Sequence, residues 1–192
     1  MPIVEDLPPR PPEELLACTV FDTALGRCGL VWSSQGVVAA RLPEVTVETL
    51  RRRFPSAQEC LEWPPTIAEA IAGVQALLRG ELCDLRHVVL DERGLPAFRR
   101  AVHALTRAIE PGQTRTYGEI AAALGEPGAA RAVGRAEAEN PFPPIVPCHR
   151  VMGVGGEPTG FSAPGGIDTK RRLLLIEARA AGQLAGDQQA LF

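Results

Sequence analysis

The stretch TYGEIAAALGEPGAARAVGRAEAE, residues 116–139, determines how the second half of the chain is interpreted. Thr116 and Glu119 have the spacing of a capping box, which starts a helix. The segment GEPG at 125–128 breaks that helix, and a second short helix is predicted over 129–139. Helix, tight glycine-bearing turn and helix form the pattern of a helix-turn-helix, although the spacing alone also fits an ordinary helical hairpin.

Helices are predicted on both sides of this pair. Four apolar residues upstream fall on one helical stripe that ends at the EPGQ turn: Phe98, Val102, Leu105 and Ile109. Downstream, a glycine- and proline-rich loop at 153–166 leads to a last helix over 169–180, with Asp168 as its expected N-cap. The second half is therefore predicted to be mostly α-helical.

The first half predicts a small α/β unit. Three segments rich in β-forming residues (16–22, 26–33 and 36–42) are separated by turn residues and suggest an antiparallel meander. One helix is predicted over about 46–53. A second is predicted to open at Thr66, with Glu69 completing a capping box, and to stop at Gly80. RHVVLD, residues 86–91, is predicted as a further strand.

These patterns divide the chain into four segments. Residues 1–14 contain five prolines and four acids and are expected to form a flexible tail. Residues 15–93 form the first predicted domain, residues 94–181 the second, and residues 182–192 a C-terminal tail.

The composition is that of a soluble globular protein, with 45% hydrophobic and 22% charged residues among 192. No apolar run approaches the roughly 18 residues of a membrane span, and the acidic, proline-rich start lacks the features of a secretion signal. We therefore expect a cytoplasmic protein with free thiols. Residues 96–192 carry 11 basic and 9 acidic side chains, a balance of +2 against −5 for the rest, which only weakly favours a nucleic-acid partner.

The stretch NPFPPIVPCHRV, residues 140–151, surrounds one cysteine with four prolines. Prolines fix the backbone and favour extended neighbours, so Cys148 is expected in a preorganised, extended segment. His149 and Arg150 follow, and either could stabilise a thiolate. The alternative is a buried, inert cysteine. A zinc site is a further alternative for Cys18, Cys28, Cys83 and His87, but no Cys-x-x-Cys pair exists, and we predict no metal and no cofactor.

Several motifs in order resemble the O6-alkylguanine-DNA alkyltransferase family, the methylated-DNA–protein-cysteine methyltransferases. They are GQTRTYGEIAAALG, RAVGRA, NPFPPIV, PCHRV and GFSAPGGIDTKRRLLLIE, within Phe98 to Glu177. Residues 15–93 are similar, more loosely, to the family's first domain. The resemblance implies a ribonuclease-H-like α/β domain with a small antiparallel sheet, followed by a mostly α, winged-helix-like domain with a helix-turn-helix.

The resemblance also implies a reaction. One alkyl group would pass from O6-alkylguanine in duplex DNA to Cys148, once per molecule, after the nucleotide is flipped out of the helix. His149 would act through water as the base, and Glu177 would orient it. Tyr117 would donate a proton or a hydrogen bond to the guanine ring.

The remaining residues that the resemblance implies fall into two groups. Four would contact the minor groove of the DNA, with Arg131 filling the gap left by the flipped base: Thr116, Ala130, Arg131 and Arg135. Four would form the base pocket and its hinge: Asn140, Val151, Phe161 and Ser162. We expect a monomer that binds double-stranded DNA and no membrane.

Three departures from the family's pattern stand out. His103 occupies a position where the family commonly has an aromatic residue, Phe161 stands where tyrosine is frequent, and the loop SAPGG is longer than usual. Two other functions stay open from the residues alone. One is a DNA-binding lesion sensor or regulator with an incidental cysteine, and the other is a hydrolase that uses Cys148 and His149.

Overall fold

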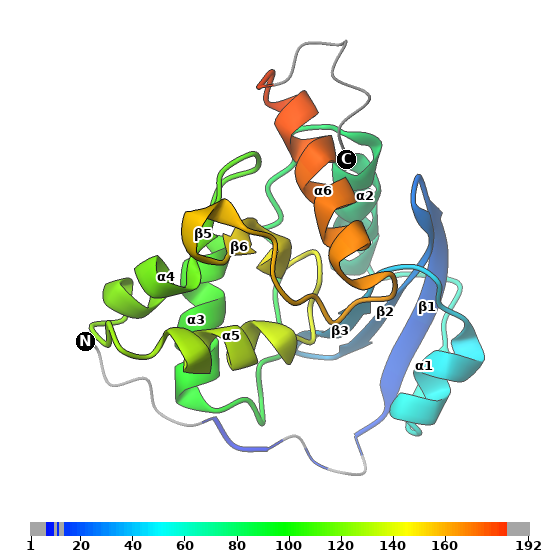
Figure 1. The fold of residues 1–192 in the computed structure, drawn as a ribbon. Coiled ribbons are helices and arrows are strands. Elements are labelled where there is room, and N and C mark those ends of the chain that lie inside the picture. The colour runs from blue at the N-terminus through cyan, green and yellow to red at the C-terminus, as the bar shows by residue number, and fades with distance from the viewer. Residues whose placement is uncertain (1–6, 10, 12–13, 184–192) are drawn as a thin grey trace.

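The computed structural model describes residues 7–9, 11 and 14–183 (Figure 1). Most of the two predicted tails, 1–14 and 182–192, therefore lies outside the described residues. No helix in the described part of the chain combines the length and the hydropathy of a membrane span.

A four-stranded sheet forms the centre of the first half. Its strands are β1 (Leu16–Thr23), β2 (Gly26–Ser33), β3 (Gly36–Arg41) and β4 (Ala57–Glu59), in the spatial order β3-β2-β1-β4. The first three form the predicted antiparallel meander. The prediction of a purely antiparallel sheet is wrong, because β4 pairs with β1 in parallel. A three-residue strand carries no alternation from which it could be predicted.

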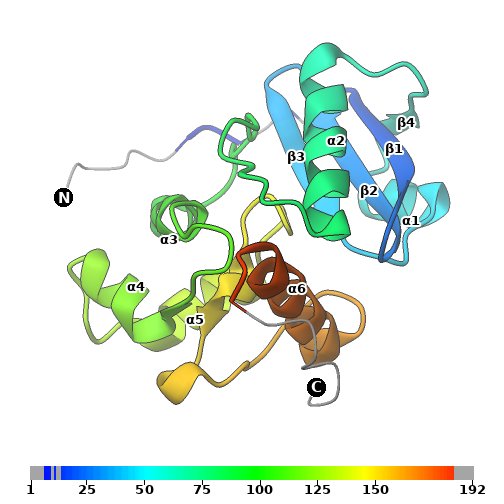
Figure 2. The same cartoon turned by 90° about the horizontal axis from the view of Figure 1, so that it is seen from above.

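Helices cover the two faces of this sheet (Figure 2). Helix α2 (Pro65–Arg79) packs Ile71 and Leu77 against a core that includes Leu30 of β2. Helix α1 (Val47–Arg53) packs Leu50 against the other face. The predicted capping box of Thr66 is absent: the N-cap of α2 is Pro64, which makes no side-chain cap bond. Pro65 has the fixed φ and missing N–H that suit the first helical position, so the helix starts before Thr66.

The strand predicted over residues 86–91 is wrong. This segment makes a single bridge, Val37 to Leu90, beside β3. The guanidinium of Arg107 lies 2.8–3.1 Å from the carbonyl oxygens of Leu85, Arg86 and Val88 and so uses acceptors that a strand ladder would need. The backbone of this segment is therefore held by Arg107, a side chain of the next helix, and not by a strand ladder.

The second half is a compact group of helices. They are α3 (Ala97–Arg107), α4 (Tyr117–Ala123), α5 (Ala130–Ala138) and α6 (Gly166–Ala180). Val102, Ile120 and Val133 join α3, α4 and α5 in one core. The capping box of α4 is present as predicted, with Thr116 and Glu119 bonded reciprocally. The stripe on α3 is correct except that the helix ends at Arg107, before Ile109.

Two short strands and two 3-10 turns complete this half. Strands β5 (Arg115–Thr116) and β6 (Val151–Met152) pair in parallel and were not predicted. The turns are η1 (Cys148–Arg150) and η2 (Val154–Gly156). This two-stranded sheet joins the segment before α4 to the segment after η1.

Helix α6 lies between the two halves. It runs beside α2 (Figure 1), and its Leu173 belongs to the core beneath the four-stranded sheet. The prediction of Asp168 as N-cap is wrong, because the cap is Gly165, in the left-handed region at φ 81°. Glycine adopts this conformation without steric cost, so α6 begins earlier and Asp168 falls in its first turn.

Candidate active site

Cys148 is buried at the start of the η1 turn, with 5% of its surface exposed. The prediction of an extended segment is wrong here: Arg150 N–H donates to the carbonyl of Pro147 and closes one 3-10 turn. The Asn140 amide donates to Val146 O at 2.8 Å, and its Oδ1 accepts from Phe142 N–H at 2.9 Å. Asn140 thus fixes the proline-rich loop before the cysteine.

A buried ion-pair network follows the cysteine. His149 Nε2 lies 2.8 Å from Glu177 Oε1, and Arg150 bonds both oxygens of the same carboxylate at 2.8–3.2 Å. Arg150 also donates to the carbonyl of Ile109. The expectation that Arg150 could stabilise a thiolate is therefore wrong, since its donors face Glu177.

The network fixes the protonation of the histidine. Burial alone would raise the pKa of Glu177, but the His149 ring and Arg150 lower it to about 2, so the group is a carboxylate. A carboxylate only accepts, so His149 Nε2 carries the proton that bonds it. Burial lowers the pKa of His149, which keeps the ring neutral and leaves Nδ1 with a lone pair. Nδ1 is buried and bonds no atom of the residues that the structure describes.

The thiol of Cys148 is held in its neutral form. Burial raises its pKa to about 12, and the charge of Glu137 adds to this effect. The amide of Asn140 and the charge of Lys170 act in the opposite direction but do not offset burial. A preformed thiolate is therefore disfavoured, and a base must remove the proton as the sulfur reacts.

Tyr117 is the first residue of α4, and it interacts electrostatically with Cys148. Its hydroxyl donates to Thr159 O at 3.2 Å. Lys170 Nζ lies 5.8 Å from the centre of the Tyr117 ring and donates to Val151 O at 2.6 Å and to Thr159 O at 3.0 Å. Lys170 is fully buried, so it ties β6, the loop around Thr159 and α4 into one wall.

Most of the other predicted residues line two separate hollows or pack into the cores. Arg131 and Arg135 are exposed on α5 and line a hollow of about 420 Å³, while Ala130 begins the same helix. Asn140 and the exposed Ser162 line a separate cleft of about 290 Å³. Val151 is fully buried, and Phe161 packs against the core of the first half.

The burial of three charged residues was not predicted from the sequence: Glu137, Arg150 and Lys170. One signal was present in α6. Lys170, Leu173 and Glu177 are three and four residues apart, the spacing of one helical face. Two charges on the apolar face of a helix indicate buried polar partners.

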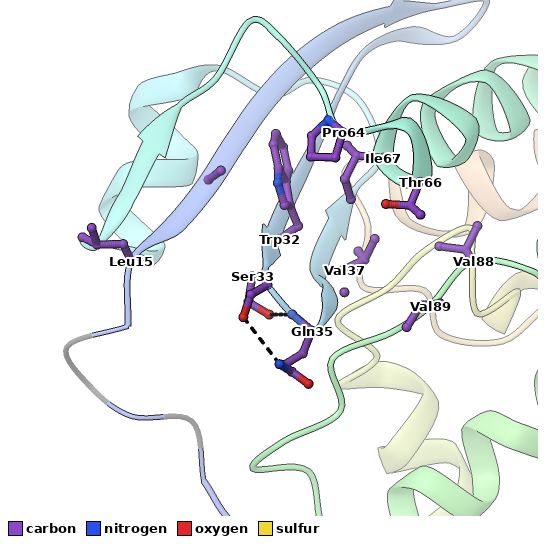
Figure 3. A pocket seen from close by; sticks show the side chains of 13 residues that line it. Leu15, Trp32, Ser33, Gln35, Val37, Pro64, Thr66, Ile67, Val88 and Val89 are labelled. Atoms are coloured by element: carbon purple, nitrogen blue, oxygen red, sulfur yellow. Dashed lines mark hydrogen bonds between the residues drawn. The ribbon is translucent and has the colours of Figure 1, made fainter.

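The alternative zinc site finds no support among the described residues, which contain no cluster of three or more potential ligands. Cys18 and Cys28 belong to cores on opposite faces of the sheet. A cleft of about 480 Å³ lies on the first half, beside Trp32, Val37 and Ile67 (Figure 3). None of its lining residues is an acid, a base or a cysteine, so it offers no group for the chemistry of Cys148.

Known proteins resemble this chain in sequence and in fold. The profile of a family described as "6-O-methylguanine DNA methyltransferase, DNA binding domain" matches residues 97–179. A methylated-DNA–protein-cysteine methyltransferase of Mycolicibacterium paratuberculosis is 39% identical over 82% of this chain and 90% of its own length. One of Methanosarcina acetivorans is 44% identical over 82% of this chain and 96% of its own length.

A solved structure has the same fold over most of the chain. The crystal structure of Mycobacterium tuberculosis OGT in complex with DNA superposes with a TM-score of 0.71 and 35% identity, covering 85% of this chain and 94% of that one. With two relatives near 40% identity over most of their length, the conclusion does not depend on the PCHRV segment alone. The chain belongs to the methylated-DNA–protein-cysteine methyltransferase family.

Proposed function

We propose that this protein repairs DNA by transferring one alkyl group from O6 of an alkylated guanine in duplex DNA to Cys148. The observation that carries the proposal is the buried thiol of Cys148 followed by a neutral His149, whose Nε2 is held by Glu177 and whose Nδ1 is free to accept a proton. The acceptor and the base thus lie together in a segment whose sequence marks the family.

The reaction is a displacement at the alkyl carbon. The thiol proton leaves through a water molecule to His149 Nδ1 while the sulfur electron pair forms the new carbon–sulfur bond. The carbon–O6 bond breaks, and its electron pair goes to guanine, which takes a proton from the hydroxyl of Tyr117. A thioether has no easy route back to a thiol, so each molecule reacts once.

The pocket residues orient the base. A guanine stacked in the duplex cannot reach a buried thiol, so the nucleotide is flipped out. Val151, Phe161 and Ser162 line its pocket, and Asn140 holds the loop that carries the nucleophile. On the DNA side, Arg131 fills the gap in the stack, and Thr116, Ala130 and Arg135 contact the minor groove.

The finer architecture belongs to the same proposal. Residues 15–93 form a ribonuclease-H-like domain, and residues 94–181 form a winged-helix-like domain in which α4 and α5 are the helix-turn-helix. We further propose that the protein acts in the cytoplasm as a monomer and needs no cofactor.

The test is transfer of label from duplex DNA that carries a labelled methyl group at guanine O6. The parent protein is expected to become labelled at Cys148, and Cys148→Ala is expected to stay unlabelled. Cys60→Ala is the matched control, because that thiol is half-buried and far from the proline-rich loop in sequence. Equal labelling of Cys148→Ala and parent would contradict the proposal. DNA binding without any label would favour a lesion-binding module.

A further inference from the structure

Glu137 is a buried acid that the proposed reaction does not use. It lies in the last turns of α5 with 4% of its surface exposed. Its Oε1 is 2.5 Å from the hydroxyl of Thr106 on α3. Its Oε2 is buried and bonds no atom of the described residues. A carboxylate in such a place would be strongly under-solvated.

The hydrogen bonds of Thr106 indicate which form Glu137 takes. Thr106 Oγ1 lies within hydrogen-bond distance of two acceptors, the carbonyl of Val102 at 2.9 Å and Glu137 Oε1 at 2.5 Å, but its hydroxyl has only one proton to donate. It can bond both groups only when Glu137 is protonated and donates to it. Both bonds therefore coexist with a neutral Glu137, whereas ionisation would force the hydroxyl to leave Val102 or the carboxylate.

The charged and titratable groups around Glu137 come from four elements. Cys148 on η1, Tyr117 on α4 and Lys170 on α6 interact with it electrostatically. On α3, His103 Nε2 lies 3.5 Å from the carbonyl oxygen of the neighbouring Ala136. Arg99, also on α3, is bonded to Glu139. Burial lowers the pKa of His103 to about 4, so its ring is neutral, and Lys170 is the cation that acts on both Glu137 and Cys148.

These charges oppose each other at the sulfur. Lys170 favours negative charge on Cys148, and an ionised Glu137 disfavours it. Burial raises the pKa of Glu137 to about 7, although the charge of Lys170 acts against the rise. The thiol loses its proton as it attacks, so the sulfur gains negative charge on the way to the transition state, and a nearby carboxylate destabilises that charge.

We infer that Glu137 is a positioning residue for alkyl transfer: as a neutral acid it leaves the charge of Lys170 uncompensated at Cys148, and its ionisation slows the reaction. The inference rests on the proposed function. It gives the protein a reaction rate that falls as the pH rises through neutrality, through a residue that never touches the alkylated base.

The experiment compares the parent with Glu137→Gln, which keeps the shape but cannot ionise. The rate of Cys148 alkylation by free O6-benzylguanine is measured by intact mass between pH 5.5 and 8.5, so that DNA binding plays no part. Near pH 6 the two proteins are expected to react at similar rates. Near pH 8, where about one parent molecule in ten keeps a neutral Glu137, the variant is expected to be about tenfold faster. Glu139→Gln, an exposed acid two residues along, is expected to follow the parent.

A ratio of variant to parent rates that does not change with pH would overturn the inference while leaving the proposed function intact. No alkylation of the parent at any pH would instead overturn the proposed function and the inference with it. A measurement on the parent alone covers the case in which the variant does not fold. The carboxyl carbon of Glu137, assigned through the backbone of α5, is expected to titrate by NMR near pH 7, and an ordinary acidic midpoint would refute the inference.

Discussion

Burial, together with Arg150, keeps His149 neutral. A buried histidine beside a carboxylate is often held as a cation, because the negative charge favours its protonated form. Here Arg150 already neutralises Glu177, so burial dominates and lowers the pKa of His149. The residue pair His149–Arg150 thus provides a base that is already neutral near physiological pH.

This state predicts where the rate depends on His149. A base acts when it is unprotonated, so the rate rises with pH through the pKa of His149, and this rise is complete above that pKa. Because that pKa lies below its usual 6.5, the rise is expected on the acid side of pH 6.5. His149→Gln is expected to abolish the rise, and the exposed His87→Gln to preserve it. A rise centred above pH 6.5 in single-turnover kinetics would show that His149 is not the base.

Helix starts show how far local sequence reaches. The capping box of α4 was predictable because its bonds join two residues, Thr116 and Glu119, that are three positions apart in the sequence. The same spacing failed for Thr66, because a preceding proline supplied a better first position. The cap of α6 failed because a glycine in the left-handed region made an earlier start possible.

The elements that sequence could not predict depend on distant partners. Strands β4, β5 and β6 have two or three residues each and exist only through pairing with another segment. Residues 86–91 have strand-like side chains, yet the carbonyls of Arg86 and Val88 accept hydrogen bonds from the distant Arg107. In the site, the cysteine segment was recognisable, and the spacing of Lys170 and Glu177 on α6 was a signal of buried charge. The burial of Glu137 and Arg150 depends on contacts with distant segments, at Thr106 and Ile109.

The two candidate caps predict different stability losses. Thr116→Ala removes a side chain that bonds the first turn of α4 and is expected to lower the free energy of unfolding by about 1 kcal/mol. Thr66→Ala lies at the exposed second position of α2 and is expected to change it by less than about 0.5 kcal/mol. Urea denaturation measures both. An equal loss would mean that Thr66 caps α2 after all.

The position of Arg131 at the start of α5 makes a prediction about binding. Arg131→Ala is expected to slow repair in duplex DNA far more than reaction with the free base, because only the duplex has a stack to open. Arg172→Ala, an exposed arginine on α6, is the matched control for loss of one positive charge. Comparable losses on duplex and free base would exclude a gap-filling role for Arg131.

At the scale of the molecule, α6 makes the site depend on the junction of the two halves. Leu173 packs beneath the sheet of the first half, while Lys170 and Glu177 on the same face hold the site of the second. Because the charged residues of the site are buried, their protonation affects the free energy of unfolding. Glu137 and Glu177 do so with opposite signs, because burial raises the pKa of one and ion pairing lowers that of the other.

The stability of the whole protein is therefore expected to change with pH in two windows. The raised pKa of Glu137 means that the native state holds a proton that the unfolded state releases, so stability falls from about pH 4.5 to 7, by an amount on the order of 3 kcal/mol. The lowered pKa of Glu177 contributes stability that is present above about pH 4.5 and lost towards pH 2. In urea denaturation across pH, Glu137→Gln should remove the first loss. A variant that keeps the parent's slope between pH 4.5 and 7 would contradict this assignment.

The most direct test of the account is the stoichiometry of transfer. Duplex DNA containing O6-methylguanine is added in increasing excess to the parent protein, and intact-protein and peptide mass are measured after the reaction ends. The account predicts that each molecule gains one methyl group, that the group is on Cys148, and that no further DNA is repaired once every Cys148 has reacted. Continued repair by molecules already methylated, or a methyl group on another residue, would contradict it.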